Sequence, residues 1–276
     1  MDHLDRIAEE FTRQAKTFER WAEETDDASR LRAALGAAGQ GRLLDIACGP
    51  GVVTAAVAPG AACVIGLDAT EAMLERARAR CAKAGLANVA FARGDAENLP
   101  FGNASFDGVV TRAAVHHFAD PQRTFDQMFR VLRGGGRTVI LDVVSSEDAN
   151  ESSLHNAIEQ LRDPSHVRML APSELAAGLV RAGFRDIAHS TWDMERELEE
   201  WLAIVNDPAR AAPLRIVIRA LAEVGRTAGI GLSVRDGRVV FFLAGGWSRR
   251  PGRLSTNGRG ARTTFELEPL TLRRLR

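Results

Sequence analysis

A glycine-rich turn directly after a short apolar run is the segment of this sequence best suited to bind a ligand. The run begins at Leu43 and contains Asp45, and the turn Gly49-Pro50-Gly51 follows it. Glycine has no Cβ, so the backbone of such a turn approaches a ligand closely at the end of a strand. A tight turn that binds nothing has the same composition, so a ligand site needs a second supporting feature.

That second feature is a carboxylate 17 residues after Gly51. Asp68 ends the apolar run 64–67. In a nucleoside-binding β-α-β unit, an acid at this position accepts hydrogen bonds from both ribose hydroxyls. Asp68 could instead cap the next helix, although Thr70 is better placed for that role. We predict that Asp68 binds a ribose.

The nucleoside ligand is then either a nicotinamide dinucleotide or S-adenosylmethionine. The dinucleotide fingerprint has a third small residue, which Thr54 replaces in this sequence. A pyrophosphate would also lie on a turn that contains Pro50, which has no N–H to donate. S-adenosylmethionine has no phosphate, so both departures favour it.

The segment from residue 43 to about 144 resembles the class I S-adenosylmethionine-dependent methyltransferases, especially the ubiquinone/menaquinone-biosynthesis-type branch. Each motif is common alone, but their order and spacing together are specific to this family. The resemblance fades after about Phe242. The motifs are Leu-Asp-Ile-Ala-Cys-Gly-Pro-Gly (44–51), Gly-Leu-Asp-Ala-Thr-Glu-Ala-Met-Leu (66–74), Gly-Asp-Ala-Glu-Asn-Leu-Pro-Phe (94–101), Phe-Asp-Gly-Val-Val (106–110), His-His-Phe (116–118) and Arg-Val-Leu-Arg-Gly-Gly-Gly-Arg (130–137).

The resemblance implies that S-adenosylmethionine is the cofactor. Carboxylates and carbonyl oxygens suit its positively charged end. Asp68 would hold the ribose, Asp95 would accept from the adenine amino group, and Met73 would lie against the adenine, although core packing explains Met73 equally well. Asp45 and residues 49–51 would surround the methionine part. The full implied set is Gln14, Phe18, Asp45, Ala47, Gly49, Pro50, Gly51, Asp68, Ala69, Met73, Asp95, Ala96, Thr111 and Arg112.

Two members of that set come from the first amphipathic stretch. Residues 4–22 carry apolar side chains at helical spacing. Phe11, Gln14 and Phe18 within it resemble a stretch that covers the cofactor in this branch. Core packing alone explains Phe11, but Gln14 is a polar residue on the same face. We predict that Gln14 and Phe18 belong to a lid.

Histidines after the fourth and fifth predicted strands are the candidates for chemistry on the methyl acceptor. Methyl transfer is an in-line displacement that depends mainly on alignment, and a general base is needed only if the acceptor loses a proton. Imidazole has a suitable ordinary pKa for that role. We predict catalytic roles for His116 and His166, with helix capping or core packing as the alternative. The acceptor-contact candidates are Thr111, Arg112, His116, His117, His166 and Arg168.

The elements that position these residues alternate between strand and helix, which is typical of a parallel sheet. Strands are expected at 43–47, 63–67, 89–92, 108–111, 138–144, 184–190 and 238–243. Helices are expected at 4–22, 70–85, from 121 to the triple glycine 134–136, 172–182, and around 154–161, 198–205 and 214–224. We predict an α/β, Rossmann-like class I methyltransferase fold: a mostly parallel seven-stranded sheet with helices on both faces and a helical cap.

The chain then divides into five expected parts. They are an N-terminal helical lid at 1–40, a Rossmann-like cofactor-binding core at 41–192, a helical cap over the acceptor site at 193–236, the last core strand at 237–247 and a basic, disordered tail at 248–276. The tail carries eight Arg and two Glu. Because the whole chain has 36 basic and 36 acidic residues, the body has 28 and 34, a net charge of −6.

An acidic body argues against nucleic acid as the substrate. No apolar run approaches the roughly 20 residues that span a membrane, so we expect a cytoplasmic protein, and a homodimer stays open. The three cysteines, at spacings of 15 and 18, match no metal pattern, and we predict no metal. The predicted function is methyl transfer to a small, apolar or aromatic acceptor; the alternative is a non-methylating cyclase or ligand-binding protein.

Overall fold

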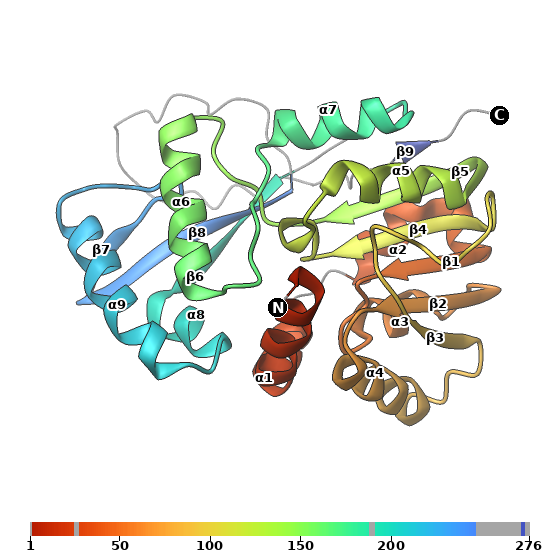
Figure 1. Cartoon of the computed structure of the whole chain (residues 1–276), viewed down its shortest axis with the longest axis horizontal. Helices are drawn as coiled ribbons and strands as arrows, with labels where there is room; N and C mark the ends of the chain where they lie inside the picture. Colours follow the sequence, from red (N-terminus) through yellow and green to blue (C-terminus); the bar gives the residue numbers. More distant parts are fainter. Residues whose placement is uncertain (1, 25–27, 188–190, 247–271, 274–276) are drawn as a thin grey trace.

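The computed structural model describes residues 2–24, 28–187, 191–246 and 272–273. Five parallel strands form most of its main sheet (Figure 1), which confirms the mainly parallel α/β fold. The two-residue strand β9 (Leu272–Arg273) pairs antiparallel with the last of them. The parallel strands lie in the order β3 (Val89–Arg93), β2 (Cys63–Asp68), β1 (Arg42–Ile46), β4 (Phe106–Arg112) and β5 (Leu132–Leu141).

Helices cover both faces of this sheet, as predicted. Alternate strand residues face opposite sides: Leu43 packs with α2 and α3, whereas Leu44 packs with α5 and α7. Both faces are therefore buried, which explains the continuous apolar runs of these strands. The bounds are α2 (Ala28–Leu35), α3 (Val52–Val57), α4 (Glu71–Lys83), α5 (Pro121–Val131) and α7 (Pro172–Ala182), with short 3-10 turns η1 (Gly36–Gln40) and η2 (Val115–His117).

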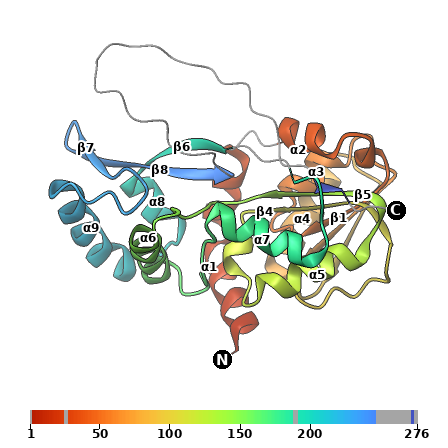
Figure 2. The same ribbon diagram turned by 90° about the horizontal axis from the view of Figure 1, so that it is seen from above.

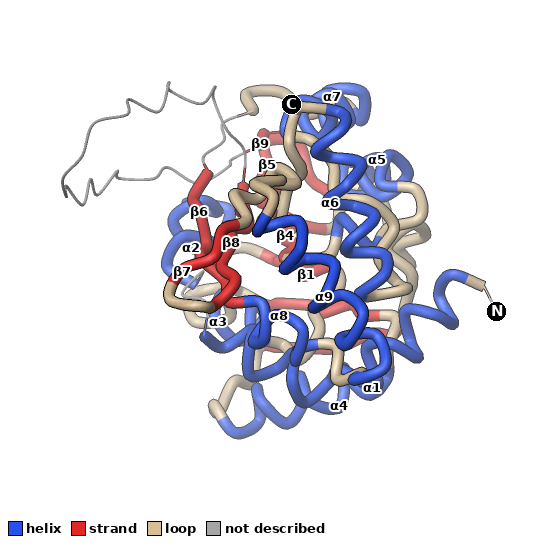
Figure 3. Tube along the Cα trace, turned by 90° about the vertical axis from the view of Figure 1, so that its left-hand side faces the viewer, coloured by secondary structure: helices blue, strands red, loops and turns tan. Residues whose placement is uncertain are grey.

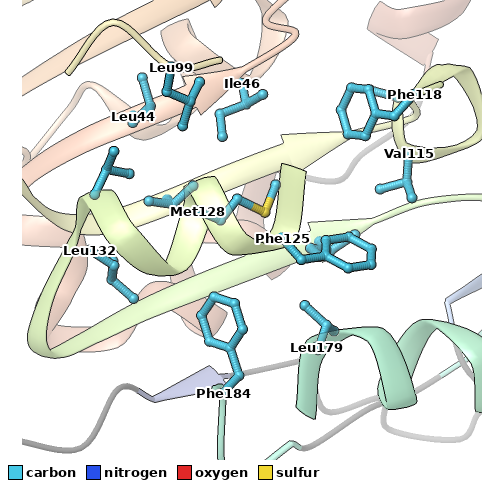
Figure 4. Close-up of a cluster of buried hydrophobic side chains, with 14 of the residues drawn as sticks. Leu44, Ile46, Leu99, Val115, Phe118, Phe125, Met128, Leu132, Leu179 and Phe184 are labelled. Atoms are coloured by element: carbon cyan, nitrogen blue, oxygen red, sulfur yellow. The ribbon is translucent and has the colours of Figure 1, made fainter. Parts of the chain in front are cut away.

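The largest core cluster lies on the α5 face of the sheet. Figure 4 shows Phe125 and Met128 of α5 between Ile46 of β1 and the side chains of Leu179 and Phe184. All five are at most 3% exposed. This packing fixes the helices that follow β4 and β5, and so it fixes the loops at the ends of those strands.

The last strands leave the main sheet. They form a second, antiparallel sheet that, with three helices, makes up the lobe on the left of Figure 1 and the near side of Figure 3. The three helices pack mainly on one another and on this small sheet. The strands are β6 (Thr191–Glu197), β8 (Arg238–Gly246) and β7 (Ser233–Arg235), and the helices are α6 (Ala149–Arg162), α8 (Leu198–Ile204) and α9 (Pro208–Glu223).

The prediction of one seven-stranded sheet is therefore wrong for the described residues, and so is the placement of 237–247 as the last core strand. Alternation in β6 gives the physical reason. Asp193 and Glu195 are exposed, while Met194 between them is half-buried. Such a strand suits an antiparallel sheet with one solvated face rather than a sheet buried on both sides. The region 193–236, expected to be helical, accordingly contains strand residues as well.

Two further element predictions are corrected. The triple glycine lies in β5, because α5 already ends at Val131. A Cβ on Gly136 would come within 2.8 Å of the Asp107 carbonyl oxygen, so glycine there permits close approach to β4. Of the strand expected at 184–190, residues 184–187 form no extended strand and residues 188–190 lie outside the described part; the next described strand is Thr191–Glu197.

The first helix, α1 (His3–Glu24), lies between the two lobes (Figures 1 and 2). Buried Glu10 on it accepts from Arg13 at 2.8 Å and from Arg210 of α9 at 2.9 Å. The Thr17 hydroxyl donates to the carbonyl of Ile204 in α8. These contacts attach α1 to the second lobe. Within the described residues, no helix is long and apolar enough to cross a membrane.

Candidate functional site

A pocket lies at the carboxyl ends of the parallel strands, where the strand order reverses between β1 and β4. Such a reversal leaves a crevice in which ligands of open α/β sheets bind. We call this the first pocket. It is lined by residues within 45–53, 67–73, 94–97 and 112–118 and by His3, Leu4, Ile7 and Phe11 of α1.

The turn after β1 has the backbone conformation that its glycines predict. Gly49 and Gly51 have φ values of 53° and 77°, in the left-handed region. A Cβ on Gly51 would lie 2.8 Å from Cβ of Ala77, so α4 packs directly on this turn. Ala47 also has a φ of 54°, which is rare for a residue with a side chain and clusters at ligand sites.

Asp45 is buried beneath this turn. Thr54 donates its hydroxyl to the Asp45 carboxylate at 2.6 Å. Burial raises the pKa of Asp45 to about 7, outweighing the opposing effects of the Thr54 hydrogen bond and the nearby Arg112 charge. The residue that departs from the dinucleotide fingerprint thus serves as the partner of this acid.

Asp68 at the end of β2 ties the turn to the start of α4. Its carboxylate accepts the main-chain N–H of Gly49 and that of Thr70, each at 2.8 Å. Burial raises the pKa of Asp68 against these hydrogen bonds. The Thr70 hydroxyl has no hydrogen-bond partner among the described residues, so Asp68, not the Thr70 side chain, holds this helix start.

Most of the predicted cofactor residues line the first pocket. The exceptions are Gly51, which packs beneath it, and buried Thr111. Gln14 lines a neighbouring pocket instead. The side chain of Phe18 lies outside the described part of the structure. The predicted residues that line the first pocket are Asp45, Ala47, Gly49, Pro50, Asp68, Ala69, Met73, Asp95, Ala96 and Arg112.

The chemistry of this lining fits S-adenosylmethionine. The carboxylates of Asp45, Asp68 and Asp95 line the pocket, as the ribose, the adenine amino group and the cationic end of this molecule require. Met73 and Phe118 add apolar surface for an adenine ring. The turn contains Pro50 and needs no phosphate partner.

A second pocket adjoins the first and shares Phe11, Ala113 and His117 with it. Phe11 of α1 meets the ring of His117 edge-on, with centroids 5.0 Å apart. The two pockets are therefore separated by only a few side chains. The second pocket is lined by Phe11, Gln14, Ala113, His116, His117, Val143, Glu159, Arg162, Asp163, His166, Met169, Trp201, Ile204 and Leu243.

His116 lines the second pocket, and a buried carboxylate binds one nitrogen of its imidazole ring. Its Nδ1 lies 2.5 Å from the carboxylate of buried Asp142, at the end of β5. Asp142 also accepts main-chain N–H groups, including those of Val115 and Val143. Burial is the largest single effect and would lower the pKa of His116, but the charge and hydrogen bond of Asp142, together with the charges of Glu159 and Asp163, raise it overall. Nδ1 is therefore the donor, and Nε2 has no hydrogen bond among the described residues.

The other two imidazoles of the pocket are weaker bases. Burial, followed by the neighbouring His116 charge, lowers the pKa of His117 to about 4 and that of His166 to about 3. His166 Nε2 lies 3.0 Å from the side-chain oxygen of Asn156, so it donates there. The three ring centroids lie between 4.3 and 6.1 Å apart.

Gln14 reaches this second pocket rather than the first. Its amide donates to buried Asp163 at 3.0 Å. Burial would raise the pKa of Asp163, but the His117 and Arg162 charges and its hydrogen bonds lower it to about 2. Arg168, also a candidate, lies on the surface, where it pairs with Glu174, and it does not line either pocket.

Sequence reasoning missed several lining residues. Leu4 and Ile7 of α1 line the first pocket, and Phe11, which was assigned to core packing from the sequence, lines both. Their spacing places them on the same helix face as Gln14, and this shared face could have predicted that they line a pocket. Asp142 was also missed, although an acid at the carboxyl end of a predicted strand is itself a site signal, as it was for Asp68.

The chain matches the model of a methyltransferase domain over residues 43–136. It is 36% identical over 170 residues to the uncharacterized methyltransferase YcgJ of Bacillus subtilis, covering 61% of this chain and 66% of that protein. It is 31% identical over 161 residues to a demethylmenaquinone methyltransferase of Clavibacter sepedonicus, covering 58% and 63%.

A crystal structure of a putative methyltransferase from Bacillus halodurans superposes with a TM-score of 0.76 at 28% identity, covering 91% of this chain and 99% of that one. The chain spans about two thirds of the length of the curated relatives it matches. Motifs, fold and relatives agree on one family. The chain belongs to the class I methyltransferases that use S-adenosylmethionine as their cofactor.

Proposed function

We propose that this protein transfers a methyl group from S-adenosylmethionine to a hydroxyl oxygen of a small, mainly apolar or aromatic acceptor. The main support for this proposal is that the second pocket adjoins the first and is lined by His116, which pairs with Asp142. S-adenosylmethionine supplies an electrophilic methyl carbon when bound. The protein has to align the acceptor oxygen with that carbon in a site from which water is excluded.

On the cofactor side, residues at the strand ends hold the two halves of the ligand. Asp68 accepts from the ribose hydroxyls while its hydrogen bonds to the main chain keep the turn in place. The carbonyl of Ala47 and the carboxylate of Asp45 face the ammonium end. Asp95 and the N–H of Ala96 bind the adenine edge, against Met73.

On the acceptor side, His116 would take the proton that the hydroxyl releases as the new carbon–oxygen bond forms and the bond from that carbon to the cofactor sulfur breaks, with S-adenosylhomocysteine as the leaving group. Asp142 accepts from Nδ1, so Nε2 carries the lone pair. The raised pKa makes Nε2 a stronger base, and the imidazole must be neutral before it can act. His166, whose Nε2 is engaged with Asn156, contacts the acceptor through Nδ1.

The lining of the second pocket supports a small acceptor. Residues from α1, α6 and α8 all line it, and apolar walls with a few polar groups are typical of small-molecule sites. The described cysteines, Cys48, Cys63 and Cys81, are free thiols. Free thiols favour a reducing compartment, and we propose the cytoplasm.

The test is to titrate S-adenosylmethionine calorimetrically and then to assay S-adenosylhomocysteine formation with phenols and quinols. We expect binding and product with at least one acceptor. Binding without product from any acceptor would favour the cyclase or ligand-binding alternative, and absence of binding would contradict the proposal.

A further inference from the structure

Arg162, which lines the second pocket, has a buried N–H group that no atom of the described residues uses. Arg162 of α6 donates its Nε to Glu159 at 2.8 Å. Its guanidinium carbon lies 4.5 Å from the ring centroid of Trp201. Its Nη1 is buried and has no hydrogen-bond partner among the described residues. A buried donor without a partner is rare and costly, and a ligand oxygen would satisfy it.

The charges around Arg162 decide which kind of oxygen fits. Glu159, buried at 2.8 Å, already neutralises the guanidinium. Asp163 lines the pocket and Asp142 lies behind His116, so carboxylates outnumber cations even when His116 is protonated. His117 and His166 are neutral near pH 7 because their pKa values are about 4 and 3. An additional carboxylate would therefore be repelled, whereas an uncharged oxygen would not.

The rest of the lining suits a flat, apolar body between the polar groups. Trp201 and Phe11 present aromatic rings, and Met169, Ile204 and Leu243 add aliphatic surface. Aromatic and apolar walls with a few placed polar groups are typical of small-molecule sites. Two hydrogen-bonding groups, Nε2 of His116 and Nη1 of Arg162, belong to residues that line this pocket from η2 and α6.

We propose that the acceptor carries a second, uncharged oxygen, a carbonyl or hydroxyl on an aromatic ring, that accepts a hydrogen bond from Arg162, and that Arg162 selects such acceptors over carboxylates. This inference rests on the proposed function, because it takes the second pocket as the acceptor site. Arg162 is thereby a specificity-determining residue for the methyl acceptor.

The experiment measures binding, so that it does not depend on turnover. The full-length protein with saturating S-adenosylhomocysteine is titrated calorimetrically with the ortho, meta and para isomers of hydroxyacetophenone, ethylphenol and hydroxybenzoate. We expect at least one hydroxyacetophenone to bind about 10- to 100-fold more tightly than the matching ethylphenol. The matching hydroxybenzoate should bind more weakly than the ketone.

The variant Arg162→Met keeps an apolar stem and should remove the ketone preference. Because it leaves the Glu159 carboxylate unpaired, the double variant with Glu159→Gln is made alongside it, and circular dichroism checks the fold of both. The matched control is Arg168→Met, which removes an arginine from the surface pair with Glu174. It should retain the preference.

Equal binding of ketone and ethylphenol in all isomers, tightest binding of a hydroxybenzoate, or a preference that survives in both Arg162 variants would each overturn the inference. The proposed function fails separately. If the ketone preference holds and depends on Arg162 while S-adenosylhomocysteine never forms from S-adenosylmethionine and these acceptors, the ligand inference stands and methyl transfer does not.

Discussion

The two pockets of this protein are built in different ways. The first is formed mostly by loops that directly follow β1, β2, β3 and β4, and most of its acidic groups, including Asp45, Asp68 and Asp95, lie in those loops or at the strand ends. The second draws on segments from Phe11 to Leu243, and its polar groups are imidazoles, carboxylates, an amide and a guanidinium that come from separate elements of the chain. Local sequence motifs predict a ligand site that is formed by the ends of strands. A site formed by networks of side chains depends on tertiary packing, which such motifs do not predict.

The largest effect should come from breaking the second pocket alone. His116→Asn removes the proton acceptor without touching the first pocket. We expect turnover to fall about 10²- to 10⁴-fold, the usual contribution of a positioned base, while cofactor affinity stays the same. Steady-state assays and calorimetric titration on the same preparation check both quantities.

The pH profile of the wild type is the matched check on this assignment. Because Asp142 raises the pKa of His116, activity should rise with pH through a value above the ordinary 6.5 of histidine. A profile without that acidic limb, or an unchanged turnover in the variant, would rule out His116 as the base.

A substitution in the first pocket should instead lower the affinity for the cofactor. Asp68→Ala removes the ribose partner and the hydrogen bonds to Gly49 and Thr70. We expect affinity for S-adenosylmethionine to fall about 100-fold, since hydrogen bonds to charged groups are among the strongest. Calorimetry measures it, with Asp193→Ala on exposed β6 as control. Equal affinities in the two variants would contradict the assignment.

These differences also explain how much the sequence predicted. The five parallel strands and the turn at 49–51 were readable because short apolar runs and glycine conformations are local properties. The second sheet was not predicted from the sequence. The late strands were expected to join the main sheet, so the alternation of residues in β6 was not read as the sign of a separate antiparallel sheet. Asp142 was missed and Phe11 was assigned to core packing because their partners, His116 and His117, lie more than 20 residues away.

Asp45 of the first pocket and the two histidines His117 and His166 should also respond to acid in opposite senses. His117 and His166 have folded pKa values below 6.5, so the unfolded state binds more protons and stability falls as the pH drops from 6.5 toward 4. Asp45 has a folded pKa of about 7 against 3.8, so its contribution to stability is present below 3.8 and is lost as the pH rises to 7.

Urea denaturation at pH 7 and pH 5 separates these contributions. His166→Gln, which keeps a donor for Asn156, should lose less stability on acidification than the wild type, by on the order of 2 kcal/mol. Asp45→Asn should lose more. If both variants track the wild type between the two pH values, the opposite titration of Asp45 and the two histidines is wrong.

The smallest effect is expected where α1 joins the second lobe. Glu10→Gln weakens the ion pairs with Arg13 and Arg210, at a cost of about 1 kcal/mol for such partly exposed partners. Since α1 lines both pockets, the KM for the acceptor should rise a few-fold, with kcat nearly unchanged.

The control is Glu199→Gln, which breaks an exposed pair with Arg215 and should leave KM as it is. An equal rise of KM in both variants would show that the ion pairs of Glu10 do not position α1 for acceptor binding.

One measurement tests most directly the claim that the two pockets form a single methyl-transfer site. The wild-type protein is incubated with hydroxyacetophenones and S-adenosylmethionine carrying an isotopically labelled methyl group, and both products are quantified by mass spectrometry. The account predicts a labelled O-methyl product and S-adenosylhomocysteine in equal amounts. Binding of both ligands with the cofactor left unconsumed would contradict it.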